Sequence, residues 1–423
     1  MHVLLSAYAC RPNSGSEEGN GWGWATHLAA RGIRVHVLTI ARDQLAIEAE
    51  QQRHPIPNLS FSFVEPAVKG LKWGHGLHYL AWQFAAVGRA KKLLTADPFD
   101  LVHHVTYGSI HVPSQLWRLG IPVVFGPVGG GQTSPFSMRH YFGKDQQKEL
   151  LRTAFTKMLR FSPLHRRWIK QMAVVFVTNQ ETLTLVKQLG RKDAVLALDV
   201  CVTQTFLAEG PRIFQECEGP LRLLWTGRMM PRKALALTLD AVSRARENVT
   251  LTIVGDGIAP EVVRQMIASR GLESKVFWKG TRVPWSEMRE LYREHDAFLF
   301  TSLRDSCGGQ LLEALALGLP VITLDHQGAR LLTPDEAGYK VPVTGKEATI
   351  SAIAAAIDAF ASSSVQQRNA MSAAGLEAAR NLTFGVRAKR AEHLYGRILA
   401  AHEMNRGSRS DAGQITITDV TPI

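Results

Sequence analysis

One stretch of the chain decides the predicted fold: Leu299-Phe-Thr-Ser-Leu-Arg-Asp-Ser-Cys-Gly-Gly-Gln-Leu-Leu-Glu-Ala-Leu-Ala-Leu-Gly-Leu-Pro-Val-Ile-Thr323. The apolar run at 298–301 predicts a buried strand. Residues 310–317 place their apolar side chains on one helical face. Gly318 and Pro320 end that helix, because glycine adopts left-handed conformations readily and proline cannot continue the hydrogen-bond ladder. The apolar residues that follow predict a second strand, so the stretch indicates an α/β protein.

The loop inside this stretch is suited to an anion. Gly308 and Gly309 allow backbone N–H groups to approach a ligand at a helix N-terminus, where the helix dipole favours negative charge. Asp305 and Glu313 flank the loop, and such carboxylates can bind hydroxyl groups. The combination predicts a nucleotide-sugar site, with a diphosphate between a ribose and a hexose. Considered alone, a glycine-containing turn with a purely structural role explains the stretch equally well.

The length and composition are ordinary for a folded protein of two or three α/β domains, with 423 residues, 45% hydrophobic and 20% charged. The four cysteines have no metal-ligand spacing, which favours a reducing cytosol without a disulfide framework. The apolar start at 1–6 is too short for a signal peptide, and no run approaches the roughly 18 apolar residues of a spanning helix. We therefore expect a cytoplasmic protein.

The chain carries a formal charge of +12, and much of the excess lies in one segment. Residues 135–170 contain four Lys and five Arg against one Asp and one Glu, so their net charge is +7 (nine minus two). Interleaved aromatic side chains fit a basic amphipathic face that rests on an anionic membrane surface, as a peripheral protein of the inner face would. A solvated helical face explains the pattern equally well. Nucleic acid explains it less well, because no binding signature accompanies the charge.

The first half opens as one β-α-β unit of a Rossmann-like domain, with strands at 2–8 and 35–40. The glycine-rich loop between them does not have the dinucleotide spacing, so no NAD site is inferred; such a loop can cover phosphates or an acceptor. A later strand ends in His103 and His104, at the carboxyl edge where ligands gather in open α/β sheets. The alternative for this pair is one buried, hydrogen-bonded histidine and one exposed histidine.

The second half repeats the α/β pattern after an aperiodic segment at 206–220, which we interpret as a linker. Its first strand, 221–226, leads into a loop that contains Arg228 and Lys233. Two cations before a helix suit a diphosphate, because their charges and the helix dipole act together. Ordinary surface charge is the alternative.

The landmarks of the second half resemble, in order, those of the retaining glycosyltransferases of GT-B family four. The matching residues are Gly227-Arg228 with Lys233, Gly255-Asp-Gly257, Lys279-Gly280-Thr281, the acids around Gly308-Gly309, and Glu313-Ala-Leu-Ala-Leu-Gly-Leu-Pro-Val. The first half is a looser match. Its Pro-Val-Gly-Gly-Gly after the strand at 122–125 resembles a subset assigned to exopolysaccharide or lipopolysaccharide assembly.

The resemblance implies two Rossmann-like domains that face a central cleft. The implied parts are 1–205 on the acceptor side, a nucleotide-sugar-binding domain at 221–383 after the linker at 206–220, and a helix at 384–404 that crosses back to the first domain. The resemblance excludes residues 405–423, whose polar and aperiodic sequence predicts a disordered tail.

The resemblance also implies residue roles. Arg228 and Lys233 would neutralise the departing diphosphate, Asp305 would contact the transferred sugar, and a histidine after Asp100, His103 or His104, would lie near the reacting sugar. Further donor-binding residues would be Gly15, Ser16, Gly227, Gly255, Gly280, Thr281, Gly308, Gly309, Gln310 and Glu313, the last on the ribose.

Two departures from the family pattern stand out. The first acid is usually Glu, and Asp305 is one methylene shorter, which bears on the sugar identity. The usual Asp-x-x-His-x-His pattern is here Asp100-Leu-Val-His-His-Val, with Val105 at the second histidine position.

The implied activity is that of a hexosyltransferase that moves a sugar from a UDP- or GDP-linked donor to a glycan or lipid-linked acceptor of the cell envelope. It would retain the anomeric configuration and use neither a metal ion nor a cofactor. Two alternatives remain open: a GT-B-like protein that binds a nucleotide-sugar or polysaccharide with little turnover, and a basic membrane scaffold that depends only on residues 135–170.

Overall fold

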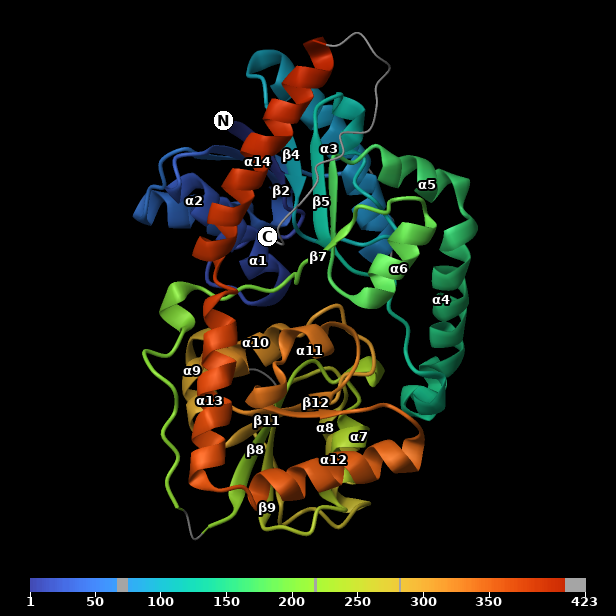
Figure 1. Cartoon of the computed structure of the whole chain (residues 1–423), viewed down its shortest axis with the longest axis vertical. Helices are drawn as coiled ribbons and strands as arrows, with labels where there is room; N and C mark the ends of the chain where they lie inside the picture. The colour runs from blue at the N-terminus through green and yellow to red at the C-terminus, as the bar shows by residue number, and fades with distance from the viewer. Residues whose placement is uncertain (67–74, 217–218, 281–282, 408–423) are drawn as a thin grey trace. The chain divides into compact units, whose positions relative to one another are not determined.

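The computed structural model describes residues 1–66, 75–216, 219–280 and 283–407. The chain divides into two compact units (Figure 1). The first comprises residues 1–131, 156–199 and 384–423, and the second comprises 132–155 and 200–383. Each unit contains one parallel sheet, as the α/β prediction requires.

The first unit has a seven-stranded sheet in the order β3-β2-β1-β4-β5-β6-β7, and every pairing is parallel. Successive strands are added first to one side of β1 and then to the other, which is the doubly wound arrangement. The strands are β1 (His2–Ser6), β2 (Arg34–Ile40), β3 (Leu59–Val64), β4 (Leu101–His104), β5 (Val123–Val128), β6 (Val174–Val177) and β7 (Val195–Leu196).

Helices cover both faces of this sheet. Leu4, Val102 and Phe125 pack in a core with α3 and α6, while alternate residues of the same strands face α1 and α14. The α-helices of the unit are α1 (Ser16–Ala30), α2 (Gln44–Arg53), α3 (His75–Ala96), α5 (Pro163–Lys170), α6 (Gln180–Gln188) and α14 (Phe384–Gly407). Its short 3-10 helices are η1 (Ala41–Asp43), η2 (Leu116–Leu119) and η4 (Leu159–Phe161).

The C-terminal helix α14 belongs to the first unit, as the resemblance implied. It packs along α1 (Figure 1), where the ring of Phe384 lies over Gly23, and Arg31 forms an ion pair with Glu392. A Cβ at Gly23 would lie 2.3 Å from that ring, so glycine permits this close approach of the two helices. The helix continues to Gly407, beyond the predicted end at 404; residues 408–423 of the predicted tail lie outside the described part of the chain.

The second unit has a six-stranded parallel sheet in the order β10-β9-β8-β11-β12-β13. The strands are β8 (Leu221–Thr226), β9 (Val249–Val254), β10 (Val276–Trp278), β11 (Ala297–Phe300), β12 (Val321–Leu324) and β13 (Gly338–Val341). The opening stretch of the sequence therefore forms β11, a loop, a helix and β12, as predicted, and β11 pairs with β12 and β8.

Two helical layers cover this second sheet. Leu223, Trp225 and Leu299 face a core shared with α7, α8 and α12, whereas Phe298 faces Tyr292 of α9 on the other side. The helices are η5 (Gln204–Phe206), η6 (Pro231–Lys233), α7 (Leu235–Val242), α8 (Pro260–Ala268), α9 (Trp285–Arg293), α10 (Gly309–Ala316), α11 (Gln327–Leu332), η7 (Asp335–Ala337), α12 (Lys346–Ala361) and α13 (Val365–Arg380).

The basic segment is divided differently from the prediction. We assigned residues 1–205 to the first domain, but 132–155 and 200–205 belong to the second unit. Residues 132–155 contain η3 (Phe136–Asp145) and most of α4 (Gln146–Met158). Met138 and Phe142 are buried in the core of the second sheet, and Tyr141 donates a hydrogen bond to Asp240 on α7 (2.6 Å).

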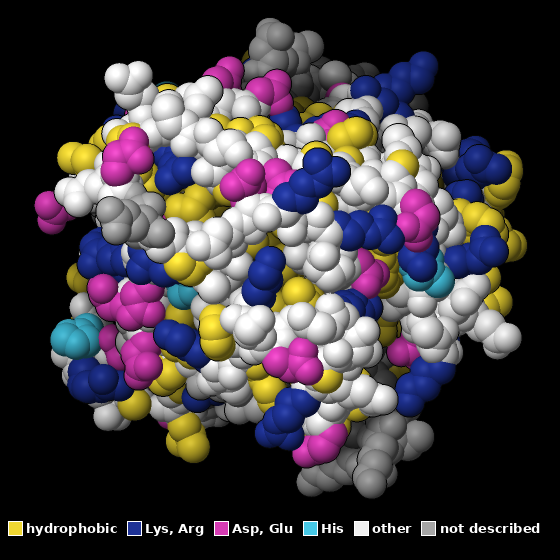
Figure 2. Space-filling view, turned by 90° about the horizontal axis from the view of Figure 1, so that it is seen from below, with side chains coloured by type: hydrophobic (Ala, Val, Ile, Leu, Met, Phe, Trp, Pro, Cys, Tyr) yellow, Lys and Arg dark blue, Asp and Glu magenta, His cyan; other side chains and the backbone are white. Residues whose placement is uncertain are grey.

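Within the described residues, no single helix combines the length and apolar composition of a membrane span, although α12 and α13 meet that criterion as a pair bent by 112°. On the face drawn in Figure 2, Lys and Arg side chains are interspersed with Asp and Glu.

The packing of residues 132–155 leads to a matched prediction. Phe142 is 4% exposed, and Phe136 of the same helix η3 is 65% exposed. We expect Phe142→Ala to lower the free energy of unfolding by about 3 kcal/mol, because it removes buried ring contacts. Phe136→Ala should change it by less than about 1 kcal/mol. Urea unfolding followed by circular dichroism measures both, and equal effects would contradict this packing.

Candidate functional site

The candidate site lies where the second sheet reverses its strand order. Strand β8 has β9 on one side and β11 on the other, so the loops after β8 and β11 diverge at their carboxyl ends. In doubly wound sheets, such a switch point is where ligands bind. The loop after β8 contains Arg228 and Lys233, and the loop after β11 contains Asp305, Gly308 and the start of α10.

Asp305 joins these two loops. Its Oδ2 accepts hydrogen bonds from Lys233 Nζ (2.5 Å), Arg232 Nη1 (3.1 Å) and Ser302 Oγ (3.2 Å). Burial alone would raise the pKa of the Asp305 carboxyl, but the charges of Lys233 and Arg232 outweigh it and hold the pKa below its usual value. The predicted pair Lys233 and Asp305 is therefore in direct contact.

The local backbone explains how Lys233 reaches Asp305. Ala234 has a left-handed conformation (φ 50°), which separates the short helix η6 from α7 and directs Lys233 inward. The Lys233 side chain is 8% exposed, and its ammonium lies 5.0 Å from the centre of the Phe300 ring. Gly308 packs against the outer edge of the same ring, where a Cβ would lie 2.4 Å from Phe300 Cζ.

Three of the predicted glycines have conformations that other residues rarely adopt. Gly227 (φ 153°), Gly255 (φ 150°) and Gly280 (φ 93°) follow β8, β9 and β10. A Cβ at Gly255 would lie 1.9 Å from the carbonyl oxygen of Gly227, so the two strand ends touch through their backbones. These glycines allow the loops at the carboxyl edge to pack closely.

Helix α10 places the second predicted acid on the same edge. Glu313 accepts a hydrogen bond from Tyr292 Oη (2.8 Å), and the same hydroxyl lies 3.4 Å from Thr226 Oγ1 at the end of β8. Burial, followed by the charge of Glu313, raises the pKa of the Tyr292 hydroxyl, so it remains a donor. Gln310 receives a hydrogen bond from this tyrosine at its backbone oxygen (3.3 Å).

The start of α10 is open at Gly309. Gly308 is the residue before the helix and Gly309 is its first residue, and a Cβ built on Gly309 would have no atom of another element within 4 Å. Arg228 is exposed at the beginning of the loop after β8. Thr281, which we predicted to bind the donor, lies outside the described residues.

The predicted residues of the first half belong to the other unit. Gly15 precedes α1, and Ser16, its first residue, has a left-handed conformation (φ 56°). In the same turn, Glu17 accepts a hydrogen bond from the backbone N–H of Tyr107 (3.0 Å), and burial raises the pKa of the Glu17 carboxyl. Sequence reasoning did not single out Glu17.

The histidine pair is buried on both sides of the first sheet. His103 donates from Nε2 to the Gly126 carbonyl (2.8 Å), so its Nδ1 accepts from Tyr395 Oη (2.5 Å). His104 lies 2.9 Å from Ser6 Oγ and 3.0 Å from Tyr79 Oη. Both side chains are 0% exposed.

The alternative that one histidine of the pair is exposed is therefore wrong. Consecutive residues of a strand point to opposite faces, and helices cover both faces of β4. The two rings have structural hydrogen bonds at every nitrogen, and this geometry gives no support to a role of His103 or His104 at the reacting sugar.

Three residues of the site are not part of the family motifs named in the sequence analysis. Arg232 shares Asp305 with Lys233, Tyr292 holds Glu313, and the side-chain oxygen of Gln327 accepts the backbone N–H of Asp305 (2.8 Å). Arg232 could have been inferred from its position beside Lys233. Tyr292 and Gln327 belong to other elements, and only the folded sheet brings them here. The described residues contain no group of three or more His, Cys, Asp or Glu placed to hold a metal ion.

Two doubly wound parallel units, one with cations and carboxylates at its switch point, are the arrangement of the GT-B fold. The family model described as Glycosyltransferase Family 4 matches residues 22–194, and that described as Glycosyl transferases group 1 matches residues 220–360. The chain belongs to this family of glycosyltransferases.

Individual relatives agree with this assignment. The chain is 25% identical over 317 residues to the 2-deoxystreptamine glucosyltransferase of Streptomyces kanamyceticus, an alignment that covers 70% of this chain and 77% of the relative. It is 30% identical over 133 residues to the amylovoran biosynthesis glycosyltransferase AmsK of Erwinia amylovora (29% and 32% of the two chains). The crystal structure of HepE from Anabaena, in complex with UDP and glucose, has the same fold, with a TM-score of 0.59 and 17% identity over 94% of this chain and 100% of that one.

The buried histidines lead to a prediction about pH. Burial lowers the pKa of His103 to about 4 and that of His104 to about 3, below the unfolded value of about 6.5. The unfolded state therefore binds more protons below that value, and stability falls as the pH falls. We expect each imidazole to contribute a loss of about 2 kcal/mol between about pH 7 and about pH 5.

The measurement is urea unfolding of the intact chain and of His103→Gln at several pH values. The variant should lose less stability on acidification than the unchanged protein, because glutamine does not titrate. His54→Gln, at an exposed position, is the matched control and should retain the full pH dependence. An unchanged slope in His103→Gln would contradict the prediction.

Proposed function

We propose that the chain transfers a hexose from a UDP- or GDP-linked donor, with retention of configuration and without a metal ion, to a glycan or lipid-linked acceptor of the cell envelope. The observation that carries the proposal is the contact between Lys233 and Asp305 beside the start of α10. It brings cations, a carboxylate and helix N–H groups to one edge of the sheet. HepE, which has this fold, binds UDP and glucose, and AmsK acts in amylovoran biosynthesis.

The residues of this edge have separate tasks in the proposal. The charge of a departing nucleoside diphosphate would be neutralised by Arg228, by Lys233 and by the N-terminus of α10. Positive groups that are already in place when this charge develops are commonly the largest catalytic contribution. Glu313, which is held by a hydrogen bond from Tyr292, would accept hydrogen bonds from the hydroxyl groups of the ribose. Asp305 would bind the transferred sugar, and the charges of Lys233 and Arg232 would keep the Asp305 carboxyl ionised.

The proposal also includes attachment to an anionic lipid surface through α4. Four large apolar side chains of this helix are exposed: Leu150 (39%), Leu151 (71%), Phe155 (54%) and Met158 (67%). At 100° per residue they lie within one arc of about 140°. The polar residues Glu149, Arg152 and Thr156 occupy the opposite, covered side.

This helix is therefore amphipathic with its apolar side outward, the reverse of an ordinary surface helix. Lysines 148 and 157 and the further cations of residues 135–170 supply charge complementary to anionic lipid. Such attachment would bring a lipid-linked acceptor to the enzyme.

The first test concerns the cations. Arg228→Ala and Lys233→Met should lower donor turnover by about 100-fold or more, because the leaving charge loses a preorganised partner. The assay measures nucleoside diphosphate released from a panel of UDP- and GDP-sugars in the presence of envelope glycans. Arg264→Ala removes an exposed arginine of α8 and should have no effect.

Arg228 is exposed, so its loss should not affect folding, and thermal unfolding verifies this for each variant. Unchanged turnover in both folded variants would reject the site. Binding of a nucleotide-sugar without turnover would favour a binding protein instead.

The second test concerns the lipid surface. Leu151→Glu combined with Phe155→Glu should weaken sedimentation with phosphatidylglycerol vesicles by about tenfold or more, because each buried apolar side chain contributes about 1.5–3 kcal/mol. Phe277→Glu, at a 50% exposed position of β10, is the matched control. Nucleotide affinity should be the same in the unchanged protein, the double variant and the control. Equal sedimentation of the double variant and the control would contradict attachment through α4.

A further inference from the structure

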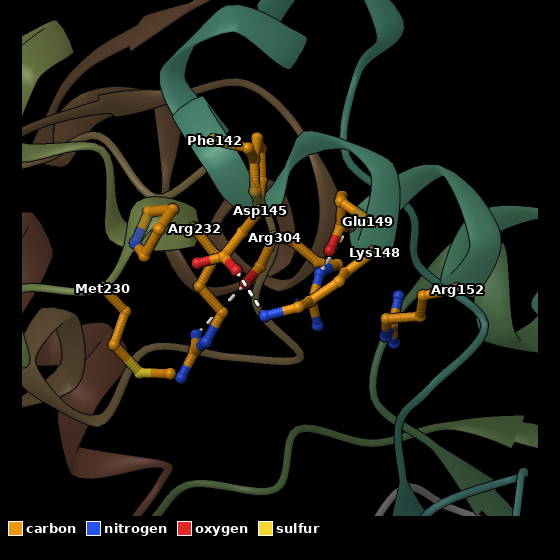
Figure 3. A pocket seen from close by; sticks show the side chains of 9 residues that line it. Phe142, Asp145, Lys148, Glu149, Arg152, Met230, Arg232 and Arg304 are labelled. Carbon is orange, nitrogen blue, oxygen red and sulfur yellow. Dashed lines mark hydrogen bonds and ion pairs between the residues drawn. The ribbon is translucent and has the colours of Figure 1, made fainter.

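A pocket lies within the second unit, beside the contact between Arg232 and Asp305. Its volume is about 240 Å³, and its walls come from residues 132–155 and from the loops after β8 and β11 (Figure 3). The charged residues of the lining are Asp145, Lys148, Glu149, Arg152, Arg232 and Arg304. None of the family motif residues named above lines this pocket, and only Arg232, through its contact with Asp305, connects it to the proposed donor site.

The wall formed by residues 132–155 is firmly held. Phe142 lines the pocket and is 4% exposed, and Tyr141 is bonded to Asp240 of α7. Glu149 on α4 forms an ion pair with Arg304 (2.8 Å) and accepts a hydrogen bond from Ser134 (2.7 Å). The pocket is thus a fixed feature of this unit.

The lining has an excess of positive charge. Four cations face two carboxylates, so the lining has a net charge of +2 (four minus two). Lys148 contacts Asp145 (2.8 Å), Arg304 contacts Glu149, and Arg232 extends to Asp305, which it shares with Lys233. Burial, followed by the charges of Arg304 and other residues nearby, lowers the pKa of Arg152 to about 10. Cations so close together would gain stability from an added anion.

We propose that this pocket binds a phosphate or diphosphate group of the acceptor, separate from the diphosphate of the donor. The inference rests on the proposed function. An arginine guanidinium group can donate two parallel hydrogen bonds to the oxygens of a phosphate. The net charge of +2 on the lining would be balanced by the −2 charge of a doubly ionised phosphate. A carboxylate would compensate only half of it. On α4, Lys148 lies on nearly the same side as Phe155, seven residues further on, and Arg152 lies next to that side. An acceptor phosphate attached to lipid would therefore meet both the pocket and the exposed apolar side chains.

The test is calorimetric titration of inorganic pyrophosphate into the intact chain saturated with UDP, or with GDP if that nucleotide binds. We expect one pyrophosphate to bind, and its affinity to fall about tenfold in Arg152→Gln and about threefold in Lys148→Gln. Lys144→Gln removes an exposed lysine next to the pocket residue Asp145 and should leave the affinity unchanged. Nucleotide affinity should stay the same in all three variants.

Two variants are needed because Arg152 also donates to the backbone oxygen of Gln132 (3.2 Å) and could affect folding. Lys148 is 82% exposed, so its replacement tests the pocket without that risk. Pyrophosphate binding that is lost when UDP saturates the chain, or that is equal in the pocket variants and the control, would overturn the proposal. So would tighter binding of glucuronate than of pyrophosphate.

Failure of the proposed function gives a different result. A chain that binds no nucleotide but still binds pyrophosphate through Arg152 would reject the donor site and support the pocket. Farnesyl diphosphate distinguishes the two sources of the acceptor phosphate. Pocket-dependent binding tighter than that of pyrophosphate supports a lipid-linked acceptor, and equal binding supports a phosphorylated glycan.

Discussion

The arrangement of the second unit depends on one buried carboxylate. Asp305 receives Lys233 from the loop after β8 and Arg232 from the same loop, and its backbone N–H is bound to Gln327. A buried charge is costly unless it is paired, so these contacts hold the two loops of the switch point in a fixed position relative to each other. Of the two cations in this contact, Lys233 belongs to the proposed donor site and Arg232 lines the pocket. Losing the carboxylate would leave two cations together without compensation.

This constraint gives neighbouring residues of one short loop different environments. Arg228 is exposed, Lys233 is covered and lies over Phe300, and Arg232 extends from Asp305 to the pocket. Asp305 is shorter than the glutamate usual in the family, and its Oδ2 is occupied by three donors. Its first effect in this structure is thus to position cations. In the proposed function, contact with a sugar would come in addition to that role.

The sequence predicted those features that depend on neighbours along the chain. The order of strands, the helix stop at Gly318 and Pro320, and the loop containing Lys233 follow from local patterns, and the folded sheets confirmed them. The strand ends were less exact, because β1 ends at Ser6 and not at residue 8, and β5 continues to Val128. The histidine pair shows what such patterns lack: the partners of His103 and His104 are Tyr395 and Tyr79, which belong to remote helices. The membership of residues 132–155 in the second unit was equally inaccessible, because an aromatic residue in a basic segment does not reveal which core it enters.

The unusual orientation of α4 follows from the same electrostatics. A surface helix normally turns its apolar side inward, because burial of that side stabilises the fold. Here the inward side meets Arg304 and the loop of Arg232, and an apolar side in that position would leave those cations without Glu149. The helix therefore places its polar side on the pocket and exposes Leu151 and Phe155. This exposure has a cost in water, so a lipid surface against the apolar side and an anion against the polar side would each relieve a separate cost. The two proposals for α4 are thus physically independent, although one helix carries both.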